Sequence, residues 1–440
     1  MDRIDNNTLR ITLERFLSRK ARVAVIGLGY VGLPLAVEFA QAGFSVLGLD
    51  VTQSRVDAIN SEQSPVLDVA DAVLAGVISS GKFRASIDHA DLADIDVFII
   101  CVPTPLRKTK EPDISFVISA TEFIRPHLRA GQLIVLESTT YPGTTDELIL
   151  GMLEDGSGLK ADQDFFLAFS PERVDPGNPT FSTQNITKVI GGVGANSTQA
   201  AVTLYSQVLE KIYAVSSARV AETAKLLENT FRAVNIGLVN EIAQLCHELN
   251  IDVWEVVNAA ATKPFGFMPF YPGPGIGGHC IPLDPHYLAW RARLSGFEPR
   301  FIALADQVNS NMPKYVVSRI AELLNDFEKS LKGSHILVFG VAYKADIDDS
   351  RESPALEVIH FLTERGAKVR YVDSFISSVK IGEEVFSAAP LNDEVLAWAD
   401  VGVVLTGHSD FDWDKIVPSM MLVFDTRNAI KFKNQKVVKL

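Results

Sequence analysis

The chain has 440 residues, of which 47% are hydrophobic and 22% charged, a composition typical of a globular protein with two or three domains. Its net charge of −13 argues against broad contact with nucleic acid or acidic membranes, because phosphate-rich partners need concentrated Lys and Arg. Three scattered cysteines do not make a disulfide framework or a zinc cluster, and neither a secretory leader nor a membrane-spanning apolar run is recognisable, so we expect a cytoplasmic protein that holds no metal.

A dinucleotide-binding unit is predicted near the start of the chain, where residues 22–50 read as strand, glycine turn, helix and a second strand ending in an acid. In the GxGxxG turn, the first glycine permits a tight turn, the second lets the backbone approach a pyrophosphate, and the third lets the helix pack on the strand. The terminal Asp50 would bind a ribose diol and repel a 2′-phosphate, which favours NAD over NADP; a glycine turn needed only for packing is the alternative. The cofactor contacts predicted here are Gly27, Gly29, Tyr30, Val31, Gly32 and Asp50.

Two further apolar runs, residues 96–106 and 132–144, end in small polar residues. Open α/β sheets bind their ligands at the carboxyl ends of the strands, so we expect Thr104 and Thr139 to face the cofactor. The alternative for each threonine is a local role in a turn or a cap.

The character of the sequence changes in the middle of the chain. From roughly 218 to 260, the apolar spacing and the absence of Pro predict a long helix, suited to a spine between domains or an interface between subunits. A Gly/Pro-rich block at 264–285 follows, then a second helical stretch and, from near 333, another α/β pattern.

We therefore predict an α/β protein with two Rossmann-like, doubly wound domains, over residues 1–215 and 329–440, joined by a helical central domain over 216–328. The second α/β half has no GxGxxG turn, so it is expected to bind something other than a second dinucleotide.

Cys280 lies behind a glycine-rich collar in the segment PGPGIGGHC. Backbone N–H groups beside Gly277 and Gly278 can stabilise anionic character on sulfur, and small neighbours give a bulky substrate access, so we predict a reactive thiol. Asp284 follows closely enough to assist and is also expected to cap a helix. The other two cysteines are expected to be small buried hydrophobes: Cys101 and Cys246.

An NAD fold with a nucleophilic cysteine suggests oxidation through a thiohemiacetal to an enzyme thioester, which water then hydrolyses. Lys225 and Asn229 lie one turn apart on the predicted long helix and could supply a cation and an amide donor from one face. Glu172 follows a strand end and could orient water. From the residues alone, each also has a plainer explanation. Lys225 could be a solvated helix charge, Asn229 a polar surface residue and Glu172 a salt-bridge partner.

Six motifs, in this order, resemble those of the nucleotide-sugar 6-dehydrogenase family, which includes UDP-glucose and GDP-mannose dehydrogenases: GLGYVG, ESTTYPGT, SPER, ETAKLLENTFRAVNIG, GGHCIPLD and YKADIDDSRESPALEV. The resemblance spans about residues 20–430. It implies an N-terminal NAD domain, a helical centre that builds a dimer or a larger homo-oligomer, and a C-terminal domain that binds the UDP part. It also implies oxidation of a sugar C6 alcohol to a carboxylate in two hydride transfers, with two NAD molecules used in turn at one site.

The resemblance assigns catalytic roles to the matching residues. Cys280 would be the nucleophile, and Lys225 would stabilise the alkoxide or oxyanion. Asn229 and Asp284 would hold the water that deprotonates the alcohol. Two more residues would support the hydrolytic water: Thr139 and Glu172.

Binding roles follow in the same way. Lys344 resembles the family's contact to the substrate phosphate, and Arg351 resembles a cofactor contact from the C-terminal domain. A basic group beyond the first strand of the second α/β domain also suits a diphosphate on chemical grounds. The substrate contacts expected in total are Glu172, Arg173, Lys225, Asn229, Tyr271, Gly277 and Lys344.

The sugar is suggested by the glycine collar. UDP-glucose enzymes carry an Arg and a Lys in this stretch, whereas Lys263 is the only basic residue between 262 and 278 here. The segment is similar instead to UDP-N-acetylglucosamine 6-dehydrogenases of bacterial surface-polysaccharide pathways such as lipopolysaccharide O-antigen synthesis. We expect UDP-GlcNAc, with UDP-GalNAc, UDP-ManNAc and UDP-glucose as alternatives. Aromatic residues that could wall a pocket for the acetyl methyl, or belong to the core, are Phe265, Phe267, Phe270 and Tyr271.

Two other functions stay open at this point. An NAD-binding regulatory protein would keep the fold without turnover, although the presence of the whole catalytic set argues against it. A 6-phosphogluconate-type dehydrogenase shares a Rossmann domain and long helices but forms no thioester, so its activity would survive loss of Cys280.

Overall fold

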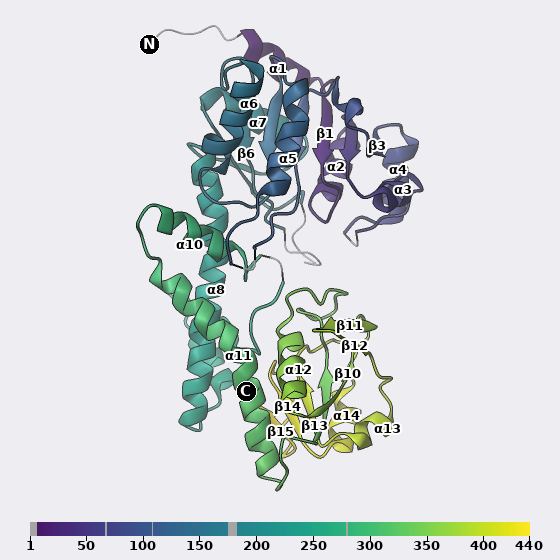
Figure 1. Ribbon diagram of the computed structural model, residues 1–440, viewed down its shortest axis with the longest axis vertical. Helices are drawn as coiled ribbons and strands as arrows, with labels where there is room; N and C mark the ends of the chain where they lie inside the picture. Colours follow the sequence, from purple (N-terminus) through teal and green to yellow (C-terminus); the bar gives the residue numbers. More distant parts are fainter. Residues whose placement is uncertain (1–6, 67, 108, 175–182, 279) are drawn as a thin grey trace. The chain divides into compact units, whose positions relative to one another are not determined.

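The computed structural model describes residues 7–66, 68–107, 109–174, 183–278 and 280–440. The chain forms two compact units, one of Met1–Glu228 with His286–Ser295 and one of Asn229–Pro285 with Gly296–Leu440. Each unit contains a largely parallel sheet with helices (Figure 1), and a long helical stretch lies between the two sheets in the sequence. The predicted α/β class is therefore confirmed, while the bounds of the three domains stay a prediction.

The sheet of the first unit has eight strands in the order β3-β2-β1-β4-β5-β6-β7-β8, parallel except between β6 and β7. Its inner strands are nearly continuous apolar runs, as expected of a parallel sheet covered on both faces. Strand order reverses between β1 and β4, which is the point where doubly wound sheets bind ligands. The strands are β1 (Arg22–Ile26), β2 (Ser45–Leu49), β3 (Phe83–Ser86), β4 (Val97–Ile100), β5 (Leu133–Leu136), β6 (Phe166–Phe169), β7 (Lys188–Gly192) and β8 (Ile212–Ala214).

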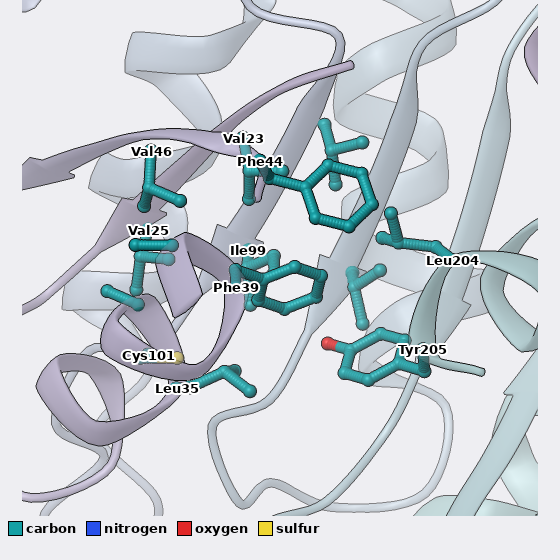
Figure 2. Close-up of a cluster of buried hydrophobic side chains, with 14 of the residues drawn as sticks. Val23, Val25, Leu35, Phe39, Phe44, Val46, Ile99, Cys101, Leu204 and Tyr205 are labelled. Atoms are coloured by element: carbon teal, nitrogen blue, oxygen red, sulfur yellow. The ribbon is translucent and has the colours of Figure 1, made fainter. Parts of the chain in front are cut away.

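Two hydrophobic clusters hold the helices of this unit on the sheet. Alternate residues of β1 enter different clusters, Val23 and Val25 one and Ala24 and Ile26 the other, because successive strand side chains point to opposite faces. Figure 2 shows the first cluster, in which Tyr205 meets Phe39 edge to face. The helices are α1 (Asn7–Leu17), α2 (Gly32–Gln41), α3 (Gln53–Asn60), α4 (Asp71–Ser79), α5 (Ser115–Ile124), α6 (Leu150–Ser157) and α7 (Ala195–Tyr205), with short 3-10 turns at His89–Leu92 and Arg125–His127 and a π-helical turn at Thr144–Ile149.

The single helix predicted over 218–260 is wrong: the structure has two, α8 (Ala218–Glu248) and α9 (Val253–Ala261). Asn250 takes the left-handed conformation with φ of 55°, which ends α8. The Asp252 carboxylate then accepts the backbone N–H groups of Trp254 and Glu255 and caps α9.

The second unit builds its sheet from five parallel strands in the order β10-β9-β13-β14-β15. Helix α11 (Arg300–Asn325) packs on it through Met312, Val316 and Ile320, in one cluster with residues of α12. The elements are α10 (Asp284–Leu294), whose later part belongs to the first unit, β9 (His335–Phe339), α12 (Pro354–Glu364), β10 (Lys368–Val372), the hairpin β11 (Ser378–Ile381) and β12 (Glu384–Ser387), α13 (Asp393–Trp398), β13 (Val401–Val404), α14 (Trp413–Ser419), β14 (Val423–Asp425) and β15 (Val437–Lys439). None of the described helices is long and apolar enough to cross a membrane.

Candidate active site

The glycine turn after β1 has the geometry that a dinucleotide needs. Gly27 has φ of 95°, and a Cβ there would lie 2.5 Å from the Cys101 carbonyl oxygen. A Cβ on Gly32, the first residue of α2, would lie 1.8 Å from the carbonyl oxygen of Gly27, so only glycine allows this helix start. A Cβ on Gly29 would meet nothing within 4 Å, which leaves its backbone open to a ligand. Tyr30 is exposed and Val31 half-buried beside this opening.

Asp50 lies at the end of β2 and is buried. Its carboxylate accepts the backbone N–H groups of Leu28 and Thr52, each at 2.9 Å, and pairs with Arg55 at 2.9 Å. Burial would raise the pKa of Asp50, but these donors together hold it below its usual value. An ionised acceptor is thus fixed next to the glycine turn, as binding of a ribose diol requires.

The two predicted threonines follow neighbouring strands of the same sheet. Thr104 lies after β4, and its carbonyl oxygen accepts the hydroxyl of Tyr287. Thr139 lies after β5 and is half-buried. The backbone that follows is held by Glu222, whose carboxylate accepts the N–H groups of Gly143 and Thr145 at 2.6 and 2.9 Å.

Glu172 follows β6 and lies in a basic environment. One carboxylate oxygen accepts the N–H groups of Arg173 and Val174 at 2.6 and 2.7 Å, and the other lies 3.4 Å from the Lys188 ammonium. Burial opposes ionisation, yet Lys188, the two N–H groups and Lys225 together lower the pKa of Glu172. The structure therefore brings Glu172 and the buried Lys225 into one electrostatic neighbourhood and keeps Glu172 ionised.

Arg173, which was predicted as a substrate contact, directly follows Glu172 in the chain. Its guanidinium pairs with Glu228 at 2.7 Å and donates to the carbonyl oxygen of Thr187 at 2.7 Å. The Glu228 carboxylate therefore balances the charge of Arg173.

Lys188 and Glu137 were not predicted from the sequence, and the structure places both beside Glu172 and Lys225. Lys188 is the first residue of β7, and its ammonium lies 2.6 Å from the Glu137 carboxylate, both side chains being buried. The available signal was a lysine opening the apolar run KVIGG, where a strand inside a sheet rarely carries a charge.

In the second unit, Asn229 and Asp284 form a direct contact. The Asn229 amide donates to the Asp284 carboxylate at 2.5 Å, and both side chains are buried. Asp284 begins α10, and its backbone N–H donates to the Cys280 carbonyl oxygen at 2.9 Å. The structure thus brings three of the predicted residues together, one from α8 and two from the segment that leads into α10.

The glycine collar is packed rather than loose. A Cβ on Gly277 would lie 2.7 Å from that of Tyr343, and Gly278, with φ of 87°, lies against the Tyr343 ring. Upstream, the Gly273 N–H donates to Asn240 of α8 at 3.0 Å, and Asn240 donates to Asn309 of α11 at 2.9 Å. Cys280 is half-buried at the end of this fixed segment, whereas Cys101 and Cys246 are buried as predicted; His279 lies outside the described residues.

The remaining binding residues lie in the second unit. Lys344 follows Tyr343, the residue that packs on the collar, and is half-buried. Arg351 forms a two-pronged pair with Asp349, at 2.9 and 2.8 Å, on the exposed side of the same loop. Tyr271 stacks on Trp254 and donates to Asn258 at 3.1 Å.

Comparisons with known proteins give the same picture in chain order. Models of the UDP-glucose/GDP-mannose dehydrogenase family match at residues 21–209 (NAD binding domain), 219–311 (central domain) and 337–432 (UDP binding domain). The first match contains the glycine turn and Asp50, so the cofactor is NAD, as predicted. When bound, NAD would be held by this turn and by the Asp50 carboxylate.

Individual relatives are similar over nearly their whole length. A UDP-N-acetyl-D-glucosamine 6-dehydrogenase of Pseudomonas aeruginosa is 35% identical over 391 residues, which cover 89% of this chain and 91% of the relative. A UDP-N-acetyl-D-mannosamine dehydrogenase of Pyrococcus horikoshii is 35% identical over 418 residues, with coverage of 93% and 96%. The solved structure of the UDP-D-ManNAc dehydrogenase from Pyrococcus horikoshii matches with a TM-score of 0.87 and 34% identity, over 95% of this chain and 98% of that one. The chain therefore belongs to the UDP-glucose/GDP-mannose dehydrogenase family, the NAD-dependent nucleotide-sugar dehydrogenases.

Proposed function

We propose that the protein oxidises the C6 hydroxyl of a UDP-N-acetylhexosamine, UDP-GlcNAc in the first place, to the uronic acid in two NAD-dependent steps that serve surface-polysaccharide synthesis in the cytoplasm. The observation that carries the proposal is the buried hydrogen bond of 2.5 Å from the Asn229 amide to the Asp284 carboxylate. The backbone N–H of the same Asp284 donates to the Cys280 carbonyl oxygen. A buried carboxylate that receives an amide is a suitable holder for a water that takes up a proton.

In the first oxidation, Asp284 and Asn229 hold the water that removes the proton from the C6 hydroxyl, and Lys225 stabilises the alkoxide. Bound NAD supplies the hydride acceptor for both oxidations. The Cys280 sulfur then attacks the aldehyde carbon, giving a thiohemiacetal whose oxidation leaves a thioester. Thr139 and Glu172 support the water that hydrolyses the thioester, and the lowered pKa of Glu172 keeps its carboxylate ionised and able to accept from that water.

Recognition of the nucleotide is assigned to the second α/β half. Its match to the family's UDP binding domain supports this assignment, as does the position of Lys344 after Tyr343. A lysine acts on a diphosphate as a point charge, so Lys344 would bind the diphosphate once the substrate enters. Arg351 would leave Asp349 to reach the cofactor.

The choice of sugar rests on the collar. Relatives named for N-acetylglucosamine and N-acetylmannosamine are equally similar, at 35% identity, and do not separate these epimers. What favours an N-acetylated sugar is the scarcity of basic residues between 262 and 278 together with aromatic side chains. Phe265, Phe267 and Tyr271 are exposed and would cover an acetyl methyl.

A second copy of the chain is the proposed macromolecular partner. Phe231, Leu238 and Leu245 are exposed and recur along α8 at intervals of seven residues, so they form one apolar stripe on the helix. Apolar stripes of this kind mark interfaces between subunits. The stripe on α8 therefore supports a homodimer or a larger homo-oligomer.

A substrate panel tests the proposal. The purified protein is incubated with NAD and, separately, with UDP-GlcNAc, UDP-GalNAc, UDP-ManNAc and UDP-glucose, while NADH absorbance and product mass are recorded. We expect two NADH per uronate formed and the highest kcat/KM with UDP-GlcNAc. A higher kcat/KM with another N-acetylated sugar would show that the proposed epimer is wrong. NAD binding without turnover of any UDP-sugar would favour an NAD-binding regulatory protein instead.

A further inference from the structure

A buried ion pair lies behind Glu172. The Lys188 ammonium is 2.6 Å from one oxygen of Glu137, and the Tyr205 hydroxyl donates to the other oxygen at 2.5 Å. All three side chains are almost fully shielded from water. Figure 2 shows Tyr205 in the hydrophobic cluster, so one end of the pair is anchored in the packed core.

The other end of the pair reaches a proposed catalytic group. The same Lys188 ammonium lies 3.4 Å from the Glu172 carboxylate, which the N–H groups of Arg173 and Val174 hold from the opposite side. Glu172 has 14% of its side chain exposed, against 2% for Lys188 and 0% for Glu137, so it is the member of this chain of contacts that meets solvent. The charge of one lysine is thus shared between a core carboxylate and a carboxylate at the site.

We propose that Lys188 is a positioning residue that holds Glu172 ionised and oriented for thioester hydrolysis, and that Glu137 and Tyr205 fix Lys188 for this purpose. The inference rests on the proposed function, in which Glu172 receives the proton of the hydrolytic water. In that step the water oxygen bonds to the thioester carbon and the carbon–sulfur bond breaks with its electron pair on the Cys280 sulfur. One water proton passes to Glu172 and the other leaves with the carboxylic acid product.

The electrostatic surroundings support this role. Burial raises the pKa of Glu137 to about 7 despite the pairing with Lys188, so that this carboxylate ionises near neutrality. Glu172 has a lowered pKa, although burial opposes its ionisation, because Lys188 is its strongest favourable partner. Lys188 therefore favours the charged form of Glu172, and Glu137 competes for the same ammonium. In the part of the chain that the structure describes, the ionisable groups that act on Glu137, Lys188 and Glu172 include Cys101, Tyr205 and Lys225.

A pair of variants gives shifts of opposite sign. In Lys188→Met/Glu137→Gln both buried charges are removed together, so no uncompensated ion is left in the core. Glu172 then loses its cation, its pKa rises, and the acid limb of the hydrolysis rate should move up by about one pH unit or more. In Glu137→Gln alone, the Lys188 ammonium pairs with the Glu172 carboxylate only. The pKa of Glu172 should then fall, and the acid limb of the hydrolysis rate should move to lower pH. Lys188→Arg should keep the wild-type limb.

The rate is measured by loading the enzyme with UDP-GlcNAc and NAD, quenching at intervals across the pH range, and following the acylated Cys280 peptide by mass spectrometry. Thermal unfolding and the Kd for NAD report whether each variant is folded. If the folded variants have the same acid limb of the hydrolysis rate as the wild type, the Lys188–Glu137 pair is purely structural and the inference is overturned. If the double variant does not fold, Glu137→Gln tests the inference by itself. An acid limb of the hydrolysis rate that stays at the wild-type pH in this variant would also contradict the inference.

The same experiment separates this inference from the proposed function. A wild-type protein that forms no acylated Cys280 peptide with any UDP-sugar of the panel contradicts the proposed function, and the role of Lys188 falls with it. An active wild type whose variants show unmoved acid limbs overturns the positioning role alone.

Discussion

Asp50 is the side chain on which cofactor choice depends. Its carboxylate is held by Leu28, Thr52 and Arg55, so it is ionised and fixed before the cofactor arrives. We expect Asp50→Ala to weaken NAD binding by about 1–3 kcal/mol, the loss of a charged hydrogen bond, as measured by calorimetric titration. Asp50→Asn, which keeps the shape, is the matched control and should lose less. A Kd for NAD that is unchanged in Asp50→Ala would mean that the ribose is held elsewhere.

Cys280 differs from the other two cysteines in its surroundings. Burial raises the pKa of the Cys101 thiol strongly, which makes that sulfur inert, while Cys280 is half-buried. We expect Cys280→Ser to abolish uronate formation while NAD still binds, because the thioester cannot form. Cys246→Ser, at a buried position in the second unit, is the control and should retain turnover. Uronate production by Cys280→Ser at the wild-type rate would support a dehydrogenase without a covalent step.

At the level of elements, the collar before Cys280 needs its glycines. Gly278 has φ of 87° and its Cβ position lies 2.9 Å from the Tyr343 ring, so Gly278→Ala combines backbone strain with a clash. We expect a loss of about 1–3 kcal/mol in unfolding free energy together with a reduced kcat, measured by urea denaturation and NADH formation. Gly266→Ala is the matched control, since Gly266 has φ of 71° with nothing within 4 Å of its Cβ position. Equal losses in both variants would show that packing on Tyr343 contributes nothing.

The turn after β9 depends on a buried acid of the second unit. Asp373 accepts the N–H groups of Val341 and Phe375, each at 2.8 Å, and lies 3.0 Å from His408. Burial would raise the pKa of Asp373, but His408 and these donors lower it to about 2. Because the folded-state pKa lies below the unfolded value of about 3.9, the stabilisation is complete above that value and is lost as the pH falls toward 2.

Asp373→Asn should therefore remove this pH dependence. We expect wild-type unfolding free energy to fall as the pH drops from about 4 to about 2, and the variant to be less stable at neutral pH with a flatter profile in that window. Urea denaturation of both proteins across this pH range measures the difference. Parallel profiles would assign the acid sensitivity to other carboxylates.

Much of each element could be predicted from local sequence, since strands, glycine turns and caps depend on residues close together in the chain. The break between α8 and α9 was missed because Asn250 in a left-handed conformation is hard to separate from an ordinary helical polar residue. Lys188 was missed for a different reason. Its partner Glu137 is 51 residues away, so neither the burial nor the pairing of the two charges is visible before β5 and β7 are placed in one sheet.

For the molecule as a whole, the apolar stripe on α8 predicts self-association. Leu238→Glu and Leu245→Glu place charges on the exposed stripe without altering the buried core. We expect both variants to shift sedimentation velocity toward a smaller species while the monomer stays folded, because burying an unpaired charge at an interface is costly. A wild-type protein that sediments as a monomer at all concentrations would contradict the proposed oligomer.

In the proposed mechanism, the sugar becomes covalently bound to Cys280 after the first oxidation and is released by hydrolysis after the second. The most direct test is mass spectrometry of the peptide that contains Cys280, after the protein has been quenched during turnover of UDP-GlcNAc with NAD. We predict a peptide carrying the acyl group of the UDP-hexosaminuronate in the wild type, at higher occupancy in Glu172→Gln, where hydrolysis is impaired. Uronate formation with an unmodified Cys280 peptide in both proteins would contradict the account.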